Sequence, residues 1–216
     1  MANINSHKLL QEAFNDLNTN GFYCLKDAID INLQEDFMKD VTSLLRLKGN
    51  RYFSVTDAMS IQDMSFKKLS ENDDIVTFLT SLSSLALKRE VVKSDSLNVL
   101  RILTGKKTDN QSFKFHYDAY ALTALIPIAI PNEEIEKSGH LVSFPNIRKF
   151  RVFFLFNLLE KILFQNTFTR KILSRVVHSN LDKYAYIMKP GNIYLFWGYR
   201  TLHANLPVDP SLKRAT

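Results

Sequence analysis

The sequence predicts an α+β protein with a mostly β core, in which helices come first and an antiparallel series of strands follows. Apolar residues recur at helical spacing up to residue 94, and short apolar runs separated by turn residues follow from residue 95. A further apolar and basic stretch, at about residues 146–182, again has a helical pattern and interrupts the strands. Helices followed by such a strand series favour an α+β fold, and a double-sheet jelly roll is the natural way to close the strands.

The first 94 residues are expected to form mainly helical support for the strands. In the first predicted helix the apolar side chains fall on one stripe, and Asn20-Gly21 ends it. The acids of Asn72-Asp73-Asp74 suit the N-terminus of the last of these helices. The helices are expected at residues 8–18, 33–47 and 74–88, with short strands at 22–25 and 51–55.

Residues 95–216 are expected to form the jelly-roll core, with the helical insertion at 146–182 inside it. Turn residues such as Gly105 and Lys189-Pro190-Gly191 separate the apolar runs. At 216 residues the chain is predicted to be a single domain, 1–216, that is long enough to bury a proper core. The strands are expected at residues 97–103, 113–118, 121–130, 140–144, 184–188 and 192–197.

The single cysteine, Cys24, bears on both redox chemistry and location. It excludes a disulfide framework within the chain and a cysteine-based zinc site, which favours a reducing, cytoplasmic compartment. Its apolar, strand-like surroundings indicate a small core residue. The N-terminus has no basic region followed by an apolar one, so no secretory signal is expected. No stretch approaches the roughly 18 uninterrupted apolar residues that a membrane span needs.

Two histidines and an aspartate form the candidate metal site. His116 and Asp118 are two residues apart in a run with strand character, so their side chains are expected on the same face. Gly191 opens a second strand-like stretch that leads to His203. Two imidazoles and one carboxylate leave coordination positions open, which suits a non-haem Fe(II) oxygenase. Either histidine in isolation is more often a hydrogen-bonded strand histidine, so the prediction depends on the combination.

An arginine completes this group of residues. Arg214 follows His203 by eleven residues and is expected to reach back into the barrel, where it would hold a dicarboxylate through two parallel hydrogen bonds. The sequence ends two residues later, at Thr216, which leaves a short strand, a truncated chain or a different anchor as alternatives. A frayed terminal charge is the simplest competing interpretation of Arg214. Arg101 and Arg200 are the other candidate anchors.

Three motifs surround these residues. They are Phe115-His116-Tyr117-Asp118, then Gly139-His140-Leu141-Val142-Ser143-Phe144-Pro145, then Gly191-Asn192-Ile193-Tyr194-Leu195-Phe196-Trp197 running on to His203 and Arg214. In these motifs the sequence resembles the Fe(II)/2-oxoglutarate-dependent dioxygenases, most closely their phytanoyl-CoA hydroxylase-like branch. The resemblance covers roughly residues 95–216.

This resemblance implies a double-stranded β-helix, which is a cupin-like jelly roll. It implies Fe(II) held by His116, Asp118 and His203, and 2-oxoglutarate that chelates the metal and places its far carboxylate on Arg214. The implied reaction converts 2-oxoglutarate and dioxygen to succinate and CO2 while hydroxylating an unactivated C–H bond. Related halogenases have Gly or Ala where this chain has the aspartate, so hydroxylation, or another oxidation such as desaturation, is favoured over halogenation.

Thr123 and Tyr194 are further candidates for contacts with 2-oxoglutarate. Both lie in alternating runs that allow them to face the barrel interior, where their hydroxyl groups would donate hydrogen bonds. Core packing or solvent exposure is the alternative for each.

The positive charge of the chain, a net +6, belongs to one segment. Residues 148–178 contain seven basic residues and one acid, whereas the rest of the chain has 21 of each. Three interpretations stay open: a lid whose Phe and Leu pack on the barrel, a helix pair on an anionic membrane surface, and a positive field that attracts an acidic substrate. Nucleic acid is disfavoured as a partner because the aromatic and basic residues are blocked rather than interleaved.

The predicted function is therefore hydroxylation of a small or lipid-like molecule by an Fe(II)- and 2-oxoglutarate-dependent dioxygenase. An alternative from a different class is a non-catalytic jelly-roll binding protein, peripheral to a membrane through residues 148–178. A metal-dependent cupin-type oxygenase or isomerase that needs no 2-oxoglutarate is a further alternative.

Overall fold

The computed structural model describes residues 6–105, 108–131, 134–149 and 166–216. In its first part, the helices predicted from the sequence are confirmed. Three of them are capped by Ser6, Asp30 and Asn72, whose side chains each accept a hydrogen bond from the backbone N–H three residues later. The apolar stripes of the longer helices supply the packing that stabilises them. These elements are α1 (His7–Thr19), α2 (Ile31–Lys48), α3 (Lys67–Ser70) and α4 (Asp73–Leu87).

Every strand pairing in the described residues is antiparallel, and the strands form two layers. One layer combines the sheets β1-β7-β4 and β2-β3-β9, which are joined because Ala215 of β9 pairs with Ala129, just after β4. The other layer is the sheet β6-β5-β8. The strands are β1 (Tyr23–Leu25), β2 (Phe53–Thr56), β3 (Val99–Leu103), β4 (Thr123–Leu125), β5 (Leu141–Phe144), β6 (Ala185–Tyr186), β7 (Ile193–Phe196), β8 (Leu202–Asn205) and β9 (Arg214–Ala215).

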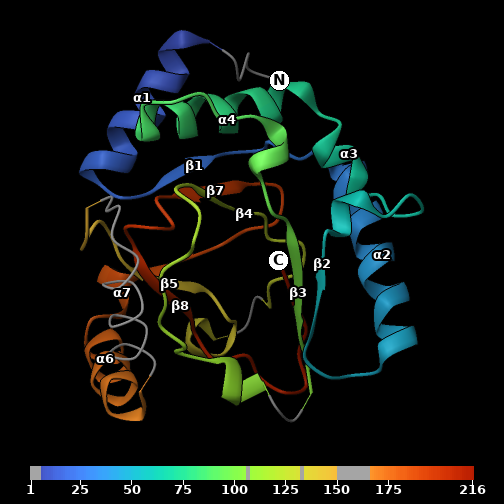
Figure 1. The fold of residues 1–216 in the computed structure, drawn as a ribbon. Helices are drawn as coiled ribbons and strands as arrows, with labels where there is room; N and C mark the ends of the chain where they lie inside the picture. The colour runs from blue at the N-terminus through green and yellow to red at the C-terminus, as the bar shows by residue number, and fades with distance from the viewer. Residues whose placement is uncertain (1–5, 106–107, 132–133, 150–165) are drawn as a thin grey trace.

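The two layers enclose an inner space and are covered by helices on the outside. Tyr194 and Phe196 of the first layer pack with Leu141 of the second, so their side chains mark the inner faces. On the outer face of the first layer, α1 and α4 lie across β1, β7 and β4, while α2 lies beside β2 and β3 (Figure 1). Helices α6 (Thr167–Ser179) and α7 (Leu181–Tyr184) lie next to β5 and β8 (Figure 1).

The largest core cluster fills the space between the helices and the outer face of the first layer. It contains fully buried residues of the helices, such as Phe37 and Leu82, together with Ile102 of β3 and Leu195 of β7. Burial of this apolar area is the main source of stability in such a domain. A smaller cluster, around Phe115 and Val177, lies between the second layer and α6.

The strand boundaries differ from the prediction at several places. The predicted strand at 113–118 is wrong: this segment forms one isolated bridge, and Phe113 has a positive φ of 51° that breaks the extended conformation. The predicted strand at 121–130 shortens to β4 plus a bridge at Ala129. In the insertion, α6 and α7 confirm helices, residues 146–149 are not helical, and 150–165 lie outside the described residues.

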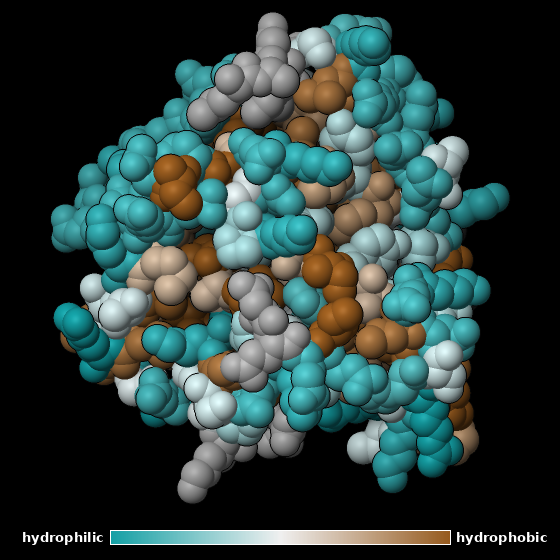
Figure 2. Space-filling model, turned by 180° about the vertical axis from the view of Figure 1, so that it is seen from behind, coloured by the Kyte–Doolittle hydropathy of each residue, from teal (hydrophilic) through white to brown (hydrophobic). Residues whose placement is uncertain are grey.

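Seen from behind (Figure 2), hydrophilic residues dominate, and hydrophobic side chains gather around the middle of the face. Among the described residues, none of the helices combines the length and the hydrophobicity that a membrane span requires.

Candidate metal centre

Three side chains from distant parts of the chain converge on one point. One nitrogen each of His116 and His203 and a carboxylate oxygen of Asp118 lie within 4.8 Å of one another. The Asp118 carboxylate is 3.6 Å from His116 Nε2 through Oδ1 and 3.5 Å from His203 Nε2 through Oδ2. The backbones explain this approach, because His116 and His203 exchange two N–H···O=C hydrogen bonds of 3.0 Å across an isolated bridge.

The hydrogen bonds of the two histidines suit metal binding. His116 Nδ1 lies 2.8 Å from the carbonyl oxygen of Lys114, and His203 Nδ1 lies 3.0 Å from that of Thr201. A ring nitrogen beside a carbonyl oxygen carries the proton and donates it, so Nε2 keeps its lone pair. Metal-binding histidines are oriented by the same kind of outer hydrogen bond. Both Nε2 atoms are therefore ready to coordinate, and the donor set fits a divalent ion of intermediate softness.

Asp118 is held from two sides. The hydroxyl group of Thr123, in β4, donates a hydrogen bond to Asp118 Oδ2, and the Asp118 N–H donates to the carbonyl oxygen of Gly198 at 3.0 Å. A Cβ atom at Gly198 would lie 2.1 Å from Thr123 Oγ1 and 2.8 Å from Asp118 Oδ2. Only glycine therefore allows the carboxylate and its hydroxyl partner to approach the chain here.

The local electrostatics keep the ligands in their coordinating forms. Burial lowers the pKa of His203 to about 4, although the nearby Asp118 carboxylate opposes this, so the imidazole is neutral at neutral pH. Burial acts to raise the pKa of Asp118, but His203, His116 and the Thr123 hydroxyl together lower it below the ordinary value. The site thus presents a carboxylate and neutral imidazole to an incoming cation.

Arg214 is buried in the inner space with no carboxylate partner among the described residues. Its side chain is 4% exposed, and its Nε atom has no hydrogen-bond partner there. It passes directly over Gly139, where an added Cβ would lie 2.4 Å from Arg214 Cδ. Burial, followed by the charge of Arg101, lowers the pKa of Arg214 to about 10, which leaves it cationic at neutral pH. Burying an unpaired cation removes it from water and lowers the stability of the fold, and an anion from outside the chain would offset that loss.

The remaining candidates fall in different places. Thr123 and Tyr194 share the inner face, but the Tyr194 hydroxyl is engaged in the turn before β7, where it accepts from Lys189 N–H at 2.8 Å. Arg200 donates to Asn18 Oδ1 at 2.9 Å, away from the inner space. Arg101 shares the inner face with Arg214.

The sequence did not predict a buried arginine that contacts both ligand-bearing segments, the one around residues 116–118 and the one leading to residue 203. Arg148 is 5% exposed, although it belongs to the basic segment 148–178. Its guanidinium lies 3.9 Å from the ring centroids of both Tyr117 and Tyr199, and its Nε donates to the carbonyl oxygen of Tyr199. Tyr117 separates His116 from Asp118, and Tyr199 follows Gly198. Tyr117, beside two candidate ligands in the sequence, and Tyr199 were the features of the sequence that could have indicated a partner such as Arg148.

His140, in the second sequence motif, is also buried. Its Nδ1 accepts a hydrogen bond from the Met188 N–H at 3.2 Å. Burial, followed by the charge of Arg214, lowers its pKa, which favours the neutral ring.

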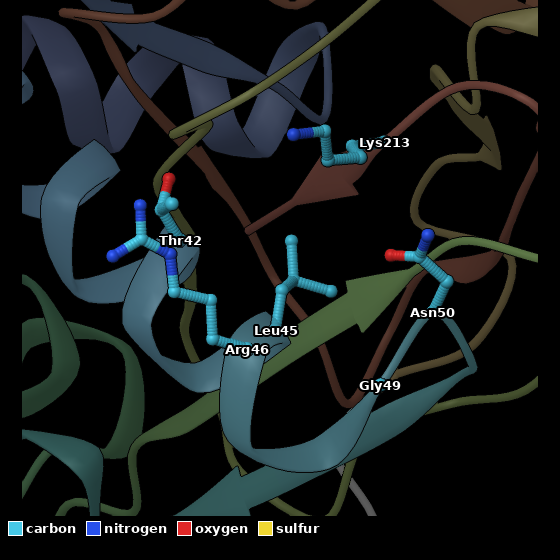
Figure 3. Close-up of a pocket in the computed structure, with 6 residues that line it drawn as sticks. All are labelled: Thr42, Leu45, Arg46, Gly49, Asn50 and Lys213. Atoms are coloured by element: carbon cyan, nitrogen blue, oxygen red, sulfur yellow. The ribbon is translucent and has the colours of Figure 1, made fainter.

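Two hollows on the outside of the molecule lack comparable chemistry. One, of about 350 Å³, lies between α2 and β9 (Figure 3). The other, of about 390 Å³, shares Thr42 and Lys213 with it and is otherwise mostly apolar. Neither contains a histidine or a carboxylate. The first is lined by Thr42, Leu45, Arg46, Gly49, Asn50 and Lys213.

Comparison with known proteins identifies the fold. No protein-family model and no curated protein matches the sequence. Solved structures do match. A prolyl 4-hydroxylase from Phytophthora capsici has a TM-score of 0.62 at 15% identity, over 95% of this chain and 59% of that one. The epimerase SnoN from nogalamycin biosynthesis, described as non-haem and α-ketoglutarate-dependent, has a TM-score of 0.57 at 13% identity, over 97% and 81%.

A third structure is HygX from Streptomyces hygroscopicus, solved with nickel and 2-oxoglutarate bound. It has a TM-score of 0.57 at 14% identity, over 95% of this chain and 83% of that one. This chain has the fold of these proteins. At such low identity the likeness establishes the architecture, and the chemistry has to be argued from the site.

Proposed function

We propose that this protein is an Fe(II)- and 2-oxoglutarate-dependent oxygenase built on a double-stranded β-helix. One combined observation carries the proposal: a convergent His-Asp-His set and an unpaired buried arginine both line the space between the two layers. A metal face with open positions and a separate cationic anchor are the two requirements for binding a chelating dicarboxylate. The similar solved structures include proteins that use this cosubstrate, which supports the same choice.

Each residue has a defined role in this proposal. His116, Asp118 and His203 hold the ion, and Thr123 fixes the orientation of the Asp118 carboxylate. When bound, Fe(II) and 2-oxoglutarate would supply the oxidising chemistry, with dioxygen as oxidant and succinate and CO2 as products. Arg214 binds the far carboxylate of 2-oxoglutarate through its planar fork, in a site that excludes water.

The inner wall positions the cosubstrate. The Phe196 ring contacts the His203 ring edge-on, with centroids 4.8 Å apart, and the Tyr194 side chain lies on the same face of β7. Because its hydroxyl is engaged in the turn before β7, we assign Tyr194 the role of an apolar wall. His140 lies beside Arg214 and, being neutral, does not compete for its anion.

Within the class, we propose hydroxylation of a small or lipid-like molecule, as in the phytanoyl-CoA hydroxylase-like branch. The carboxylate of Asp118 occupies a position that a halogenase would leave free, which supports hydroxylation. The similar solved structures include an epimerase and a carbocyclase as well as prolyl hydroxylases, so the sequence motifs carry this finer choice. The burial of Arg214 favours an enzyme over the non-catalytic alternative.

The test separates the metal face from the anchor. Calorimetry of the metal-free protein should detect one Fe(II) or Ni(II) per chain, and His203→Ala should abolish it. The metal-loaded protein should bind 2-oxoglutarate about 100-fold more tightly than 2-oxobutyrate, which lacks the far carboxylate, because charge-assisted hydrogen bonds contribute about 1.5–3 kcal/mol. Arg214→Gln should remove this preference.

Lys213→Gln is the matched control for Arg214→Gln. Lys213 is the preceding residue, but it lines the outer hollow (Figure 3), so it should leave the preference unchanged. Fe(II)-dependent release of succinate from 2-oxoglutarate, absent in His203→Ala, would complete the assignment. A wild-type protein that binds no divalent ion, or that binds both oxo acids equally, would exclude this function.

A further inference from the structure

Arg101 lies at the rim of the inner space, and we propose that its guanidinium binds an oxyanion, a carboxylate or phosphate group, of the substrate. The inference rests on the proposed function and adds the chemical class of the substrate. It assigns Arg101 as a specificity-determining residue, separate from Arg214, which binds the cosubstrate.

The register of two strands places Arg101 on the inner face. In the β3–β9 pair, Leu103 lies opposite Arg214. Two positions along, Arg101 and Thr216 exchange backbone hydrogen bonds of 2.8 and 3.1 Å. Opposed residues of an antiparallel pair, and residues two apart in one strand, have side chains on the same face. Arg101 therefore projects from the same face as Arg214.

The opposite face of the same strands supports this orientation. Leu100, Ile102 and Ala215 belong to the core cluster beneath the helices. Arg101 is the residue between two of these core positions, so its side chain is directed away from that core.

The positions of the two arginines differ in depth. Arg214 is buried, whereas Arg101 is exposed, so the row runs from the interior to the opening. The charge of Arg101 contributes to the lowered pKa of Arg214, which means that its guanidinium lies within electrostatic reach of the buried arginine. The ligand His116 has a side chain that is 27% exposed, so the opening reaches the metal face.

No carboxylate of the described residues forms an ion pair with Arg101. The residues opposite it on both sides carry hydroxyl groups, Ser54 in β2 and Thr216 after β9. Their side chains share its face, so a guanidinium fork and two hydroxyl donors form one row at the opening. Such a row is suited to carboxylate or phosphate oxygens.

Charge balance favours a substrate group over a second contact with the cosubstrate. A divalent ion, the Asp118 carboxylate, dianionic 2-oxoglutarate and the Arg214 cation together make a neutral site. Arg101 then adds one positive charge that nothing described in the chain offsets. A negatively charged group on the substrate would neutralise it, and would hold the substrate at the open side of the metal.

The experiment measures anion preference close to the metal without a known substrate. Protein loaded with Mn(II) and 2-oxoglutarate is mixed with matched probes: benzoate and benzamide, hexanoate and hexanamide, phenyl phosphate and phenol. Paramagnetic broadening of the probe NMR signals reports only molecules near Mn(II). In the wild type, each anion should be broadened at about tenfold lower concentration than its neutral partner.

Three variants assign the preference. Arg101→Gln should bring the ratio close to one, while Arg101→Lys should retain part of it, because the charge remains but the fork is lost. Arg46→Gln is the control, since Arg46 lines the outer hollow (Figure 3), and it should leave the ratio unchanged. Arg101→Gln should also keep the wild-type affinity for 2-oxoglutarate.

The inference is overturned if the wild type has no anion preference, or if the preference survives in Arg101→Gln. It is also overturned if Arg101→Gln weakens 2-oxoglutarate as much as Arg214→Gln does, because Arg101 would then serve the cosubstrate. These outcomes leave the proposed function intact. A wild-type protein that fails to bind Mn(II) together with 2-oxoglutarate overturns both.

Discussion

The two faces of the β3–β9 strand pair differ in chemistry. The outer face presents buried apolar side chains, including Ile102 and Ala215, to the core beneath the helices. The inner face presents Arg101 and Arg214 to the space that contains the candidate metal ligands. Because strand side chains alternate, adjacent residues of these strands point to opposite faces, one toward the core and the next toward the inner space. The outer face therefore supplies stability and the inner face supplies binding, so substitutions should affect the two properties separately.

The largest expected effect is on the inner side. Asp118→Ala removes one of three ligands and should weaken Fe(II) or Ni(II) binding on the order of a thousandfold or more, about 4 kcal/mol, by calorimetry. The unfolding free energy of the metal-free protein should fall by only about 1 kcal/mol, because relief from burying the carboxylate partly offsets the lost Thr123 hydrogen bond.

The exposed carboxylate of Asp63 offers the control for this substitution. Asp63→Ala should change neither metal affinity nor stability. Strong metal binding in Asp118→Ala would mean that the ion is held elsewhere, and a large loss of metal-free stability would mean that the inner face also stabilises the fold.

The matched change on the outer face should have the opposite consequence. Ile102 is fully buried, and Ile102→Ala should lower the unfolding free energy by about 3 kcal/mol through lost burial and the cavity left behind. Urea unfolding measures this loss. Metal affinity under conditions where the variant stays folded should equal that of the wild type. A tenfold weaker metal site in Ile102→Ala would contradict the separation of the faces.

The features that sequence could predict are those with a local period. The helices followed from apolar spacing and, for α4, from the acids at its start, and α1, α2 and α4 lie within a few residues of the predicted bounds. The shared face of His116 and Asp118 followed from their spacing. The strand predicted at 113–118 failed because Phe113 takes a left-handed conformation and the segment finds its pairing in the distant β8.

Contacts between distant segments set the rest of the site. The need for Gly198 appears only when Asp118 and Thr123 pack against it, and the role of Arg148 only when Tyr117 and Tyr199 enclose it. The face of Tyr194 was predictable from alternation, but the direction of its hydroxyl depended on backbone groups of Ile187 and Lys189, which precede β7.

Substitution of Arg148 is expected to reduce both stability and metal binding, unlike the substitutions above. This buried cation stabilises the packing of two tyrosines that flank the ligand-bearing segments. Arg148→Met keeps an unbranched, flexible stem but loses both ring contacts and the hydrogen bond to Tyr199. We expect about 2 kcal/mol lower stability and, through misplaced ligands, about tenfold weaker metal binding. Denaturant unfolding and calorimetry measure the two effects.

The neighbouring Lys149 is exposed and gives the matched control. Lys149→Met should behave as the wild type in both measurements. If Arg148→Met loses stability but binds metal normally, the tyrosine stack supports only the fold, and the simple two-face comparison extends to this residue as well.

The smallest expected effect is a pH dependence that arises on the inner side. Burial and Arg214 lower the pKa of His140 in the folded state, whereas the unfolded histidine titrates near 6.5. Below that pH the unfolded chain binds more protons, so stability falls as pH decreases. In His140→Asn, the amide oxygen can still accept the hydrogen bond from the Met188 N–H. This variant should reduce the loss of unfolding free energy between pH 7 and 5.5 by about 1 kcal/mol or less.

Urea unfolding of the metal-free protein measures this effect, and His7→Asn, at an exposed histidine, is the control. An equal pH slope in His140→Asn and the wild type would show that burial of this imidazole beside Arg214 contributes nothing to stability.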